Sequence, residues 1–451
     1  MTDTPLAGTS ILSFKVTVTG VSLTPSTGKA VSLTLNPPTP IIELAHLQSD
    51  SAFLGTSTVP SANYTSATVS FSSPDIVLFN QTNGTLTGGT APCLATSVCE
   101  FKPAKSGMIT LSTAPFPLTL TANQQTGLSL DFNLNNAITM TNGAVSVDFT
   151  QANVLTAATL PRTGTPSGAL DLVEDFTGVI TAVSGNSVTV HSDTKGTITA
   201  VANSSTTFNI DPNVCTMQNL TCLANNKTVS TDASLNPDGT MTLLEADLLH
   251  NVAVDEVEGT VFAVNAVAPQ ISLVLSDKTV VSGNPVLTAA TGGTIVQASL
   301  GATPTFSVDT KGLSAVLGSS PGDIADFVSL ANVFAGQTVR MQVTNPSTVP
   351  GSTNIAVNTN FVVLRFSRVT ATVSLPPAGS FFSVSAATLP SFLGGISGLV
   401  NIPVQVSSGQ TQFDGVTDIT RLNVGDSISI RALYIPNFLT SPFFAAKVRK
   451  Q

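Results

Sequence analysis

Short segments in which apolar residues alternate with Ser, Thr and other polar residues recur along the chain, and this period of two constrains the fold more than any other feature. The clearest examples are Phe14–Val18, Tyr64–Phe71, Leu128–Leu134 and Ala144–Phe149. Because successive side chains of a strand point to opposite faces, each such segment predicts a strand with one buried and one solvated face. Turn residues such as Asn83-Gly84 separate the segments, which is typical of an antiparallel sandwich.

The composition favours strands over helices. Only 10% of the 451 residues are charged, whereas about a quarter are charged in ordinary soluble domains. Ser, Thr and Asn supply the remaining polarity, and 33 Gly and 27 Pro favour turns. These residues are poor helix formers. We therefore expect an all-β protein, and the chain is too long for one hydrophobic core.

The sequence pattern changes after Phe149, and this change divides the chain. The segment Leu160–Gly168 is rich in Pro, Gly and Ser, which is typical of a linker. We predict an N-terminal antiparallel β-sandwich, Ig-like or transthyretin-like, followed by three small β-barrel or β-sandwich domains in series. The predicted boundaries are 1–153 for the sandwich, 154–173 for the linker, and 174–254, 255–367 (with an insertion) and 368–451 for the three β repeats.

The three downstream units share a degenerate repeat. Its opening strand occurs as Gly178–Val183, Gly259–Val264 and Val369–Val373, and its centre as Thr207-Phe208, Thr305-Phe306 and Gln412-Phe413. A turn Gly leads into the next strand at Gly336 and Gly425, and the first copy lacks it. The Gly permits positive φ at a hairpin or bulge, and the Phe is suited to filling a small barrel. Both roles are structural.

The four cysteines form two local pairs, Cys93 with Cys99 and Cys215 with Cys222, both in polar turn segments. An even count in such segments suits an oxidising compartment, although four cysteines allow three connectivities. We expect each local pair to form a disulfide. Zinc binding is an alternative, but neither pair has the two-residue gap of a zinc knuckle or a nearby His. Free thiols in a cytoplasmic protein are the third reading.

The charge balance argues against nucleic acid as a partner. The net charge is −9 and Lys plus Arg total 17, which provides no basic footprint for a phosphate backbone. We interpret the basic residues of the last third as solvated strand ends that protect sheet edges. They are Arg365, Arg368, Lys447, Arg449 and Lys450.

No apolar run approaches the roughly 20 residues needed to cross a bilayer, so we expect no transmembrane segment. The residues Met1–Pro5 lack the basic and apolar regions of a signal peptide. Either the protein stays inside the cell or the sequence begins after a removed export segment. The cysteines favour the second reading, which gives an extracytoplasmic, cell-surface or secreted protein.

No catalytic constellation is recognisable, and we expect no enzymatic activity and no cofactor. The three histidines lie far apart in sequence, and no Gly-x-Ser-x-Gly elbow is present. One acidic cluster, Asp255, Glu256 and Glu258, lies at a junction between two repeats, where carboxylates could hold calcium (Ca²⁺) and stiffen the joint. It lacks the residue order of a calcium loop, and a solvated hinge is the competing interpretation.

Two Phe doublets near the C-terminal end suggest a protein contact. On a strand, Phe381-Phe382 and Phe443-Phe444 each present one ring to each face of the sheet. One ring of each doublet, Phe382 or Phe444, is a candidate contact with a partner protein, and burial between packed domains is the alternative.

Three segments of the first third carry a resemblance to a known family, namely Thr2-Asp3-Thr4-Pro5 leading into Phe14–Val18, Val59–Thr65, and Leu130-Asp131-Phe132. In these segments the chain resembles a bacterial domain of unknown function, DUF4382. This resemblance implies an exported protein, often a lipoprotein. The downstream repeats look like a second such family, DUF5666, most closely in Thr411–Gly415 followed by Leu422–Asp426. Neither resemblance implies a catalytic residue or a ligand.

Together these features predict a non-enzymatic, cell-surface structural or adhesive protein. Its partner would be another surface protein or an extracellular polymer, and exposed strand edges could join copies into a homo-oligomer or filament. The alternative is an extracellular polysaccharide-binding protein. Against it, the chain has no Trp and only two Tyr, whereas sugar-stacking platforms need flat exposed aromatic faces.

Overall fold

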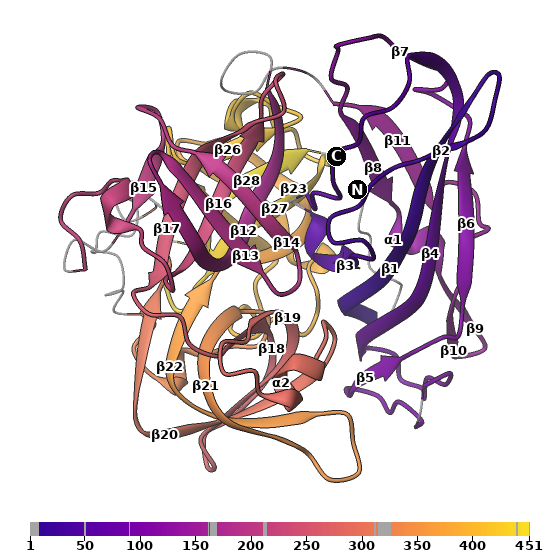
Figure 1. Cartoon of the computed structure of the whole chain (residues 1–451). Helices are drawn as coiled ribbons and strands as arrows, with labels where there is room; N and C mark the ends of the chain where they lie inside the picture. Colours follow the sequence, from indigo (N-terminus) through magenta and orange to yellow (C-terminus); the bar gives the residue numbers. More distant parts are fainter. Residues whose placement is uncertain are drawn as a thin grey trace.

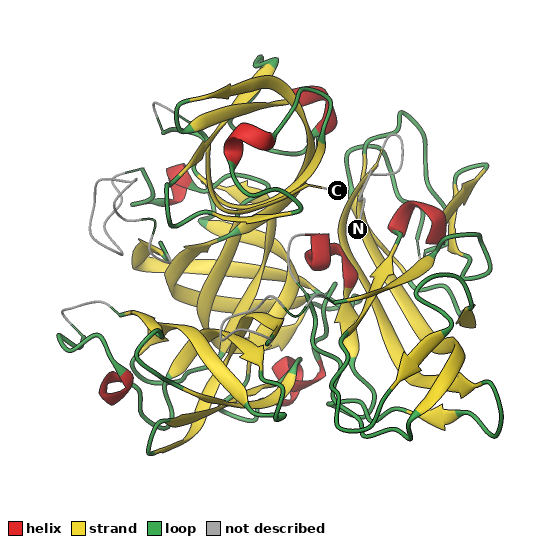
Figure 2. Cartoon of the chain, turned by 90° about the horizontal axis from the view of Figure 1, so that it is seen from above, coloured by secondary structure: helices red, strands yellow, loops and turns green. Residues whose placement is uncertain are grey.

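The computed structural model describes residues 9–48, 51–89, 91–160, 162, 169–210, 214–310, 313, 326–438 and 441–450. These residues form a nearly all-β structure of several separate sheets, which confirms the predicted fold class. An N-terminal sandwich lies beside three small barrels (Figures 1 and 2). No helix within these ranges is long and apolar enough to cross a membrane.

The sandwich is built on two long antiparallel strands, β1 (Thr9–Pro25) and β4 (Ala62–Asn80). Shorter strands extend the sheet on both sides, β2 and β3 beside β1, and β5, β6 and β7 beside β4. Two strand pairs, β8 with β11 and β9 with β10, pack over one face of this sheet. The shorter elements are β2 (Val31–Ser32), β3 (Ile41–Glu43), η1 (Leu44–Gln48), β5 (Val98–Phe101), β6 (Ser106–Leu111), β7 (Leu118–Leu120), β8 (Leu128–Phe132), α1 (Leu134–Ala137), β9 (Ile138–Thr141), β10 (Ala144–Val147) and β11 (Leu155–Thr159).

Four phenylalanines fill the centre of the sandwich. Phe14 and Phe71 come from the long strands, and Phe132 and Phe149 come from the opposite layer. The Phe132 ring meets Phe14 and Phe71 edge-on at 5.9 and 5.5 Å, while Phe149 stacks on Phe71 at 5.4 Å. The alternation read in the sequence therefore directs these rings inward, and residues such as Lys15 lie on the outer face.

The predicted linker, 154–173, is wrong at both ends. Leu155–Thr159 is strand β11, which pairs with β8 and buries Leu155 in the sandwich core. Leu170 already begins the first strand of the next unit. Residues 161 and 163–168, the Pro/Gly-rich part, lie outside the described residues.

Three barrels follow. In barrel 1 the strand order is β14-β13-β12-β16-β17-β15, and β14 also pairs with β17 to close the sheet. Barrel 2 is a closed barrel of β18-β19-β20-β22-β21, and barrel 3 has the order β25-β24-β23-β27-β28-β26, closed by β25 and β28. Barrel 1 comprises β12 (Leu170–Ser184), β13 (Ser187–Ser192), β14 (Gly196–Val201), β15 (Thr207–Asn209), η2 (Leu220–Cys222), β16 (Thr228–Leu235) and β17 (Met241–His250).

The remaining elements complete barrels 2 and 3. Barrel 2 comprises β18 (Glu256–Asn265), β19 (Gln270–Thr279), α2 (Pro285–Ala289), β20 (Ile295–Val308), η3 (Leu330–Asn332), β21 (Thr338–Thr348) and β22 (Ile355–Arg365). Barrel 3 comprises β23 (Ser367–Ala378), β24 (Phe381–Ser385), η4 (Ala386–Thr388), β25 (Asn401–Val406), β26 (Gln412–Asp414), η5 (Ile419–Arg421), β27 (Ser427–Tyr434) and β28 (Phe443–Lys450).

The barrels share one topology, and the repeated sequence elements occupy equivalent places in it. The three motif phenylalanines pair in parallel with the last strand of their own barrel, opposite Ala246, Val362 and Val448 respectively. The turn Gly positions, Gly336 and Gly425, have φ of 92° and 93°.

The first copy does have this turn, with Asn instead of Gly. Asn226 has φ of 62°, and its backbone N donates to the O of Ile180, while the N of Ile180 donates to the O of Lys227. Gly336 and Gln337 make the same two hydrogen bonds with Val261. Asn is the residue after Gly that most readily adopts this conformation, so a search for Gly alone misses the equivalence.

Candidate functional site

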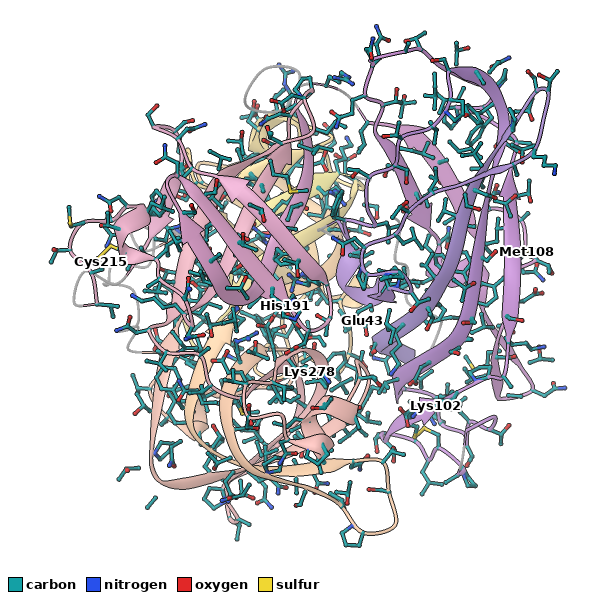
Figure 3. The ribbon with its side chains drawn as sticks, in the orientation of Figure 1. Glu43, Lys102, Met108, His191, Cys215 and Lys278 are labelled. Carbon is teal, nitrogen blue, oxygen red and sulfur yellow. A yellow bond between two sulfur atoms is a disulfide. The ribbon has the colours of Figure 1, made fainter. Side chains whose placement is uncertain are left out.

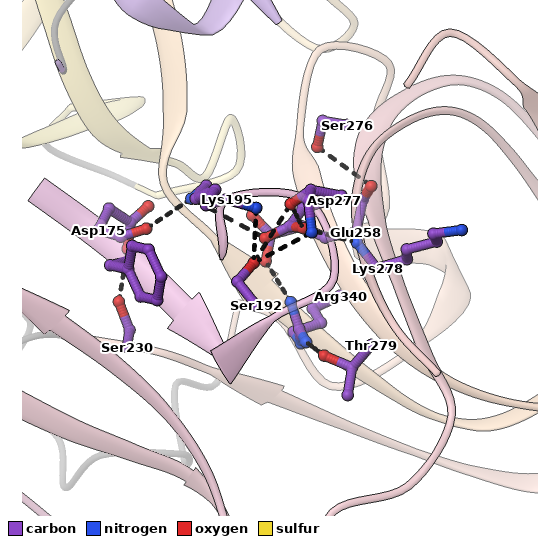
Figure 4. A network of polar contacts seen from close by, with 12 residues as sticks. Asp175, Ser192, Lys195, Ser230, Glu258, Ser276, Asp277, Lys278, Thr279 and Arg340 are labelled. Carbon is purple, nitrogen blue, oxygen red and sulfur yellow. Dashed lines mark hydrogen bonds and ion pairs between the residues drawn. The ribbon is translucent and has the colours of Figure 1, made fainter. Parts of the chain in front are cut away.

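Buried charged side chains gather where the barrels meet, and Figure 4 shows part of this network. Arg340 of β21 is 1% exposed. Its Nε lies 2.9 Å from Oε2 of Glu256, its Nη1 lies 3.3 Å from Oε2 of Glu258, and its Nη2 donates to Oγ1 of Thr279 at 2.6 Å. These contacts tie β21 to β18 and β19 on the outside of barrel 2.

Asp175 of β12 joins all three barrels. It accepts from Nη2 of Arg365, at the end of β22, at 3.1 Å, and from Nη2 of Arg368, in β23, at 2.7 Å. Arg365 also pairs with Asp309 and lies 3.3 Å from Oε2 of Glu258. A barrel 1 carboxylate therefore binds guanidinium groups from barrels 2 and 3.

Electrostatics keep this network ionised. Burial alone would raise the pKa of Glu258, but the positive charges of Arg365 and Arg340 outweigh burial and hold that pKa below its ordinary value. Glu256 behaves in the same way, with Arg340 and His250 as its partners. Burial also opposes the charge on Arg340, and the facing carboxylates raise its pKa above normal. We call this buried network the joint between the barrels. Because each of its charges is stabilised by a partner of opposite sign, removing one side chain also destabilises the side chains that face it.

A hairpin of barrel 1 adds a second contact with barrel 2. Oγ1 of Thr194 donates to Asp277 at 2.7 Å, and the backbone N of Val280 donates to Asp193 at 2.7 Å. Lys195 donates to the backbone O of Asp175 at 2.8 Å. The hairpin tip thus connects Asp175 with the end of β19 (Figure 4).

The sandwich contacts every barrel. Asn36 donates to the backbone of Thr197 in barrel 1 at 3.1 Å, and Gln81 hydrogen-bonds Ser391 in barrel 3. A cavity of about 60 Å³ lies between the sandwich and barrels 2 and 3. It has room for only a few water molecules.

The main contact between the sandwich and barrel 2 is polar and buried. Nζ of Lys15 lies 2.9 Å from Oδ2 of Asp75 and 2.5 Å from Oγ1 of Thr291, and it also donates to the backbone O of Gly292. Beside Lys15 lies Glu43, which Figure 3 labels on the side of the sandwich that faces the barrels.

The carboxyl group of Glu43 has an unusually high pKa. Its Oε1 accepts from the backbone N of Phe14 at 2.7 Å and of Ala45 at 3.3 Å, and Ser13 donates to its Oε2. Burial nevertheless dominates and raises the pKa of Glu43 to about 7. At neutral pH this side chain is therefore divided between its protonated and ionised forms.

Both expected disulfides are confirmed. Cys93 bonds to Cys99 and Cys215 bonds to Cys222, with Cα atoms 5.8 and 5.7 Å apart. Each closes a short loop at the edge of its domain, and Cys93 is fully buried in the sandwich core.

The three residues of the acidic cluster, the candidate calcium ligands, bind different partners within the protein. Asp255 caps the turn after β19 by accepting from the backbone N atoms of Val281 and Ser282, each at 2.8 Å. Glu256 and Glu258 instead face the arginines described above. Within the described ranges, no group of three or more His, Cys, Asp or Glu side chains is arranged to hold a metal ion.

The expectation of exposed Phe rings is wrong, because Phe382 and Phe444 are each 1% exposed. Phe382 lies in the core of barrel 3. Phe443 stacks on Tyr434 inside barrel 3, while Phe444 points the other way and joins the core of barrel 2. Each ring of the doublet at 443–444 does face its own side of the sheet, but a neighbouring barrel covers the outer side.

The basic strand ends are also less solvated than expected. Arg365 and Lys447 are buried, at 1% and 4% exposure, and Arg368 has a buried guanidinium. Lys447 pairs with Glu174 of barrel 1. Only Arg449 and Lys450 of this group form partly exposed ion pairs, with Asp414 and Asp426.

Sequence reasoning missed Arg340, Lys15 and Glu43. A usable signal was present, because Arg340 lies within Val339-Arg340-Met341 and Lys15 within Phe14-Lys15-Val16. In a chain with 10% charged residues, a charge in the middle of a strand indicates a paired, covered position.

One comparison with known proteins concerns the sandwich. No curated protein matches the chain. Residues 1–147 match the family model described as "Domain of unknown function (DUF4382)", which confirms the resemblance of the N-terminal third to that family.

Proposed function

We propose that the protein is a non-enzymatic, extracytoplasmic structural or adhesive protein of the cell surface. The observation that carries the proposal is the buried network around Asp175, which joins the three barrels through Arg365 and Arg368. Such a joint fixes the relative positions of the domains. A rigid body is suited to holding surfaces apart or together.

The two disulfides support an oxidising location, since such bonds persist outside the cytoplasm. The match of residues 1–147 supports the resemblance of the sandwich to DUF4382, and that resemblance implies export. We further propose that the three barrels are DUF5666-like repeats, that the native protein carries a lipoprotein-type anchor, and that its partner is another surface protein or an extracellular polymer.

Intact-mass analysis of the protein purified from its native cells tests the location. Two disulfides together with a processed or acylated N-terminus support the proposal. Four free thiols on an unprocessed chain contradict it.

Attachment assays test the role. Cells that lack the protein should adhere less to one another or to their matrix, and complementation should restore adhesion. Complementation with a chain carrying Arg365→Met should restore less, because the joint is loosened. Unchanged adhesion in the deletion strain would refute the adhesive role.

One observation favours the polysaccharide-binding alternative. A hollow of about 380 Å³ on the sandwich is lined largely by polar residues, namely Lys105, Ser106, Gly107, Thr139, Ser146, Val147, Asp148, Phe149 and Thr150. Hydroxyl and charged groups could bind sugar hydroxyls, but both tyrosines are fully buried and cannot stack on a sugar ring. A glycan array separates the two roles, because a scaffold gives no signal there, and a Ser146→Met variant, which replaces a hydroxyl of the hollow with a larger apolar side chain, would weaken a genuine signal.

A further inference from the structure

Three charged side chains lie in a row across the outer face of the sandwich. Lys15 of β1 is in register with Glu43 of β3 on one side and with Asp75 of β4 on the other. Directly opposed residues on neighbouring strands point to the same face. Phe14 and Val16, which flank Lys15, point into the sandwich core, so the three charged side chains face barrel 2.

The amine and one carboxyl group are in contact. Nζ of Lys15 lies 2.9 Å from Oδ2 of Asp75. Lys15 is 7% exposed and Asp75 is 3% exposed. Oδ1 of Asp75 is buried and has no hydrogen-bond donor among the described residues, so an ion pair leaves half of this carboxylate unsatisfied.

Barrel 2 closes the site with two glycines. A Cβ atom on Gly292 would lie 3.3 Å from Oε2 of Glu43 and 3.9 Å from Cδ of Lys15, and one on Gly293 would lie 3.9 Å from Cγ of Asp75. The bare backbone therefore covers all three side chains at close range. Glu43 and Asp75 therefore flank Lys15 on the face of the sheet that barrel 2 covers.

We propose that this trio is a modification site, in which the side chains of Lys15 and Asp75 condense to an intramolecular amide bond and Glu43 transfers the protons. The bond would cross-link β1 to β4. It forms after folding, because only the folded sheet and the docked barrel create the site.

The reaction needs no external reagent. The Lys15 ammonium first gives a proton to the Asp75 carboxylate, which leaves a neutral amine and a neutral acid. The Nζ lone pair attacks Cγ of Asp75, and Glu43 accepts a proton from the nitrogen and returns one to the departing hydroxyl group. One C–N bond forms, one C–OH bond breaks and one water molecule leaves, so no atom is oxidised or reduced.

The environment favours each of these steps. Burial raises the pKa of Asp75 above its ordinary value. Burial also raises the pKa of Glu43, to about 7, so that each carboxyl group is more readily protonated than in water. Fixing the amine against the acid replaces a bimolecular encounter by an intramolecular one. A dry site disfavours the reverse hydrolysis.

Intact-mass and peptide analysis of the full chain test the proposal. We expect the folded protein to weigh about 18 Da less than its disulfide-bonded sequence, with a branched peptide that contains Lys15 and Asp75. Glu43→Gln should restore the full mass. The control Lys102→Arg should keep the deficit, because Lys102 lies 3.8 Å from the same carboxylate but is half exposed.

A second variant distinguishes loss of the amide bond from loss of the fold. Asp75→Asn preserves the shape of the side chain, and its condensation with Lys15 would release ammonia and lower the mass by about 17 Da instead. Disulfide content and circular dichroism report whether each variant is folded. A wild-type protein of full mass with linear Lys15 and Asp75 peptides, or a deficit that persists in Asp75→Ala, would overturn the proposal.

Discussion

Replacing Arg340 with Met tests the buried joint most directly. The substitution keeps an unbranched apolar stem and removes the guanidinium, which contacts Glu256 at 2.8 Å and Glu258 at 3.3 Å. Removing one partner of a buried ion pair typically costs about 3–5 kcal/mol. Each carboxylate keeps one other side-chain partner, His250 for Glu256 and Arg365 for Glu258. We therefore expect the lower end, about 3 kcal/mol.

Hydrogen exchange is the appropriate assay, because a protein of several domains does not unfold in one step. The amides of β18 and β21 should lose about 3 kcal/mol of protection in Arg340→Met. The control Lys450→Met removes the partly exposed pair with Asp426 and should cost less than about 1 kcal/mol. Adding Glu256→Gln to Arg340→Met should recover part of the loss. Equal effects of Arg340→Met and Lys450→Met would refute the reasoning.

Three further predictions concern other parts of the chain. Because the folded pKa of Glu43 is raised from 4.5 to about 7, its contribution to stability is complete below pH 4.5 and is lost as the pH rises through 7. Thermal unfolding from pH 5 to 8 should show this loss, and Glu43→Gln should flatten the profile. Replacing Cys93 and Cys99 with Ala should destabilise the sandwich by about 2 kcal/mol, measured by urea unfolding, and an unchanged midpoint would contradict this. Gly425→Ala should cost about 1–2 kcal/mol of backbone strain, whereas Gly336→Ala should cost more, because its Cβ would lie 2.0 Å from Leu393 of barrel 3. Equal melting temperatures for the two variants would show that the contact between barrels does not matter.

Periodicity predicted the strands well because it reports the local backbone. The alternation around Phe14 and Phe71 placed both rings in the core, and the closely spaced cysteines predicted both disulfides. The repeated Phe and Gly residues located equivalent positions in the barrels. These features depend only on neighbouring residues.

The candidate site was not predictable in the same way, because it depends on which domains meet. An apolar residue on the outer face of a strand, such as Phe444, reads as exposed until a second barrel covers it. For the same reason, Arg365 read as a solvated strand end. Its partners, Asp175 and Glu258, lie far away in the sequence and no local pattern connects them.

The composition of the joint has a consequence for the order of events during synthesis. Asp175 is made 190 residues before Arg365 and 193 residues before Arg368. Until those arginines emerge, barrel 1 carries an acidic side chain whose final surroundings do not yet exist. The last barrels therefore complete the first one, because barrel 1 by itself supplies Asp175 with the hydroxyl of Ser230 but with neither of these two guanidinium groups.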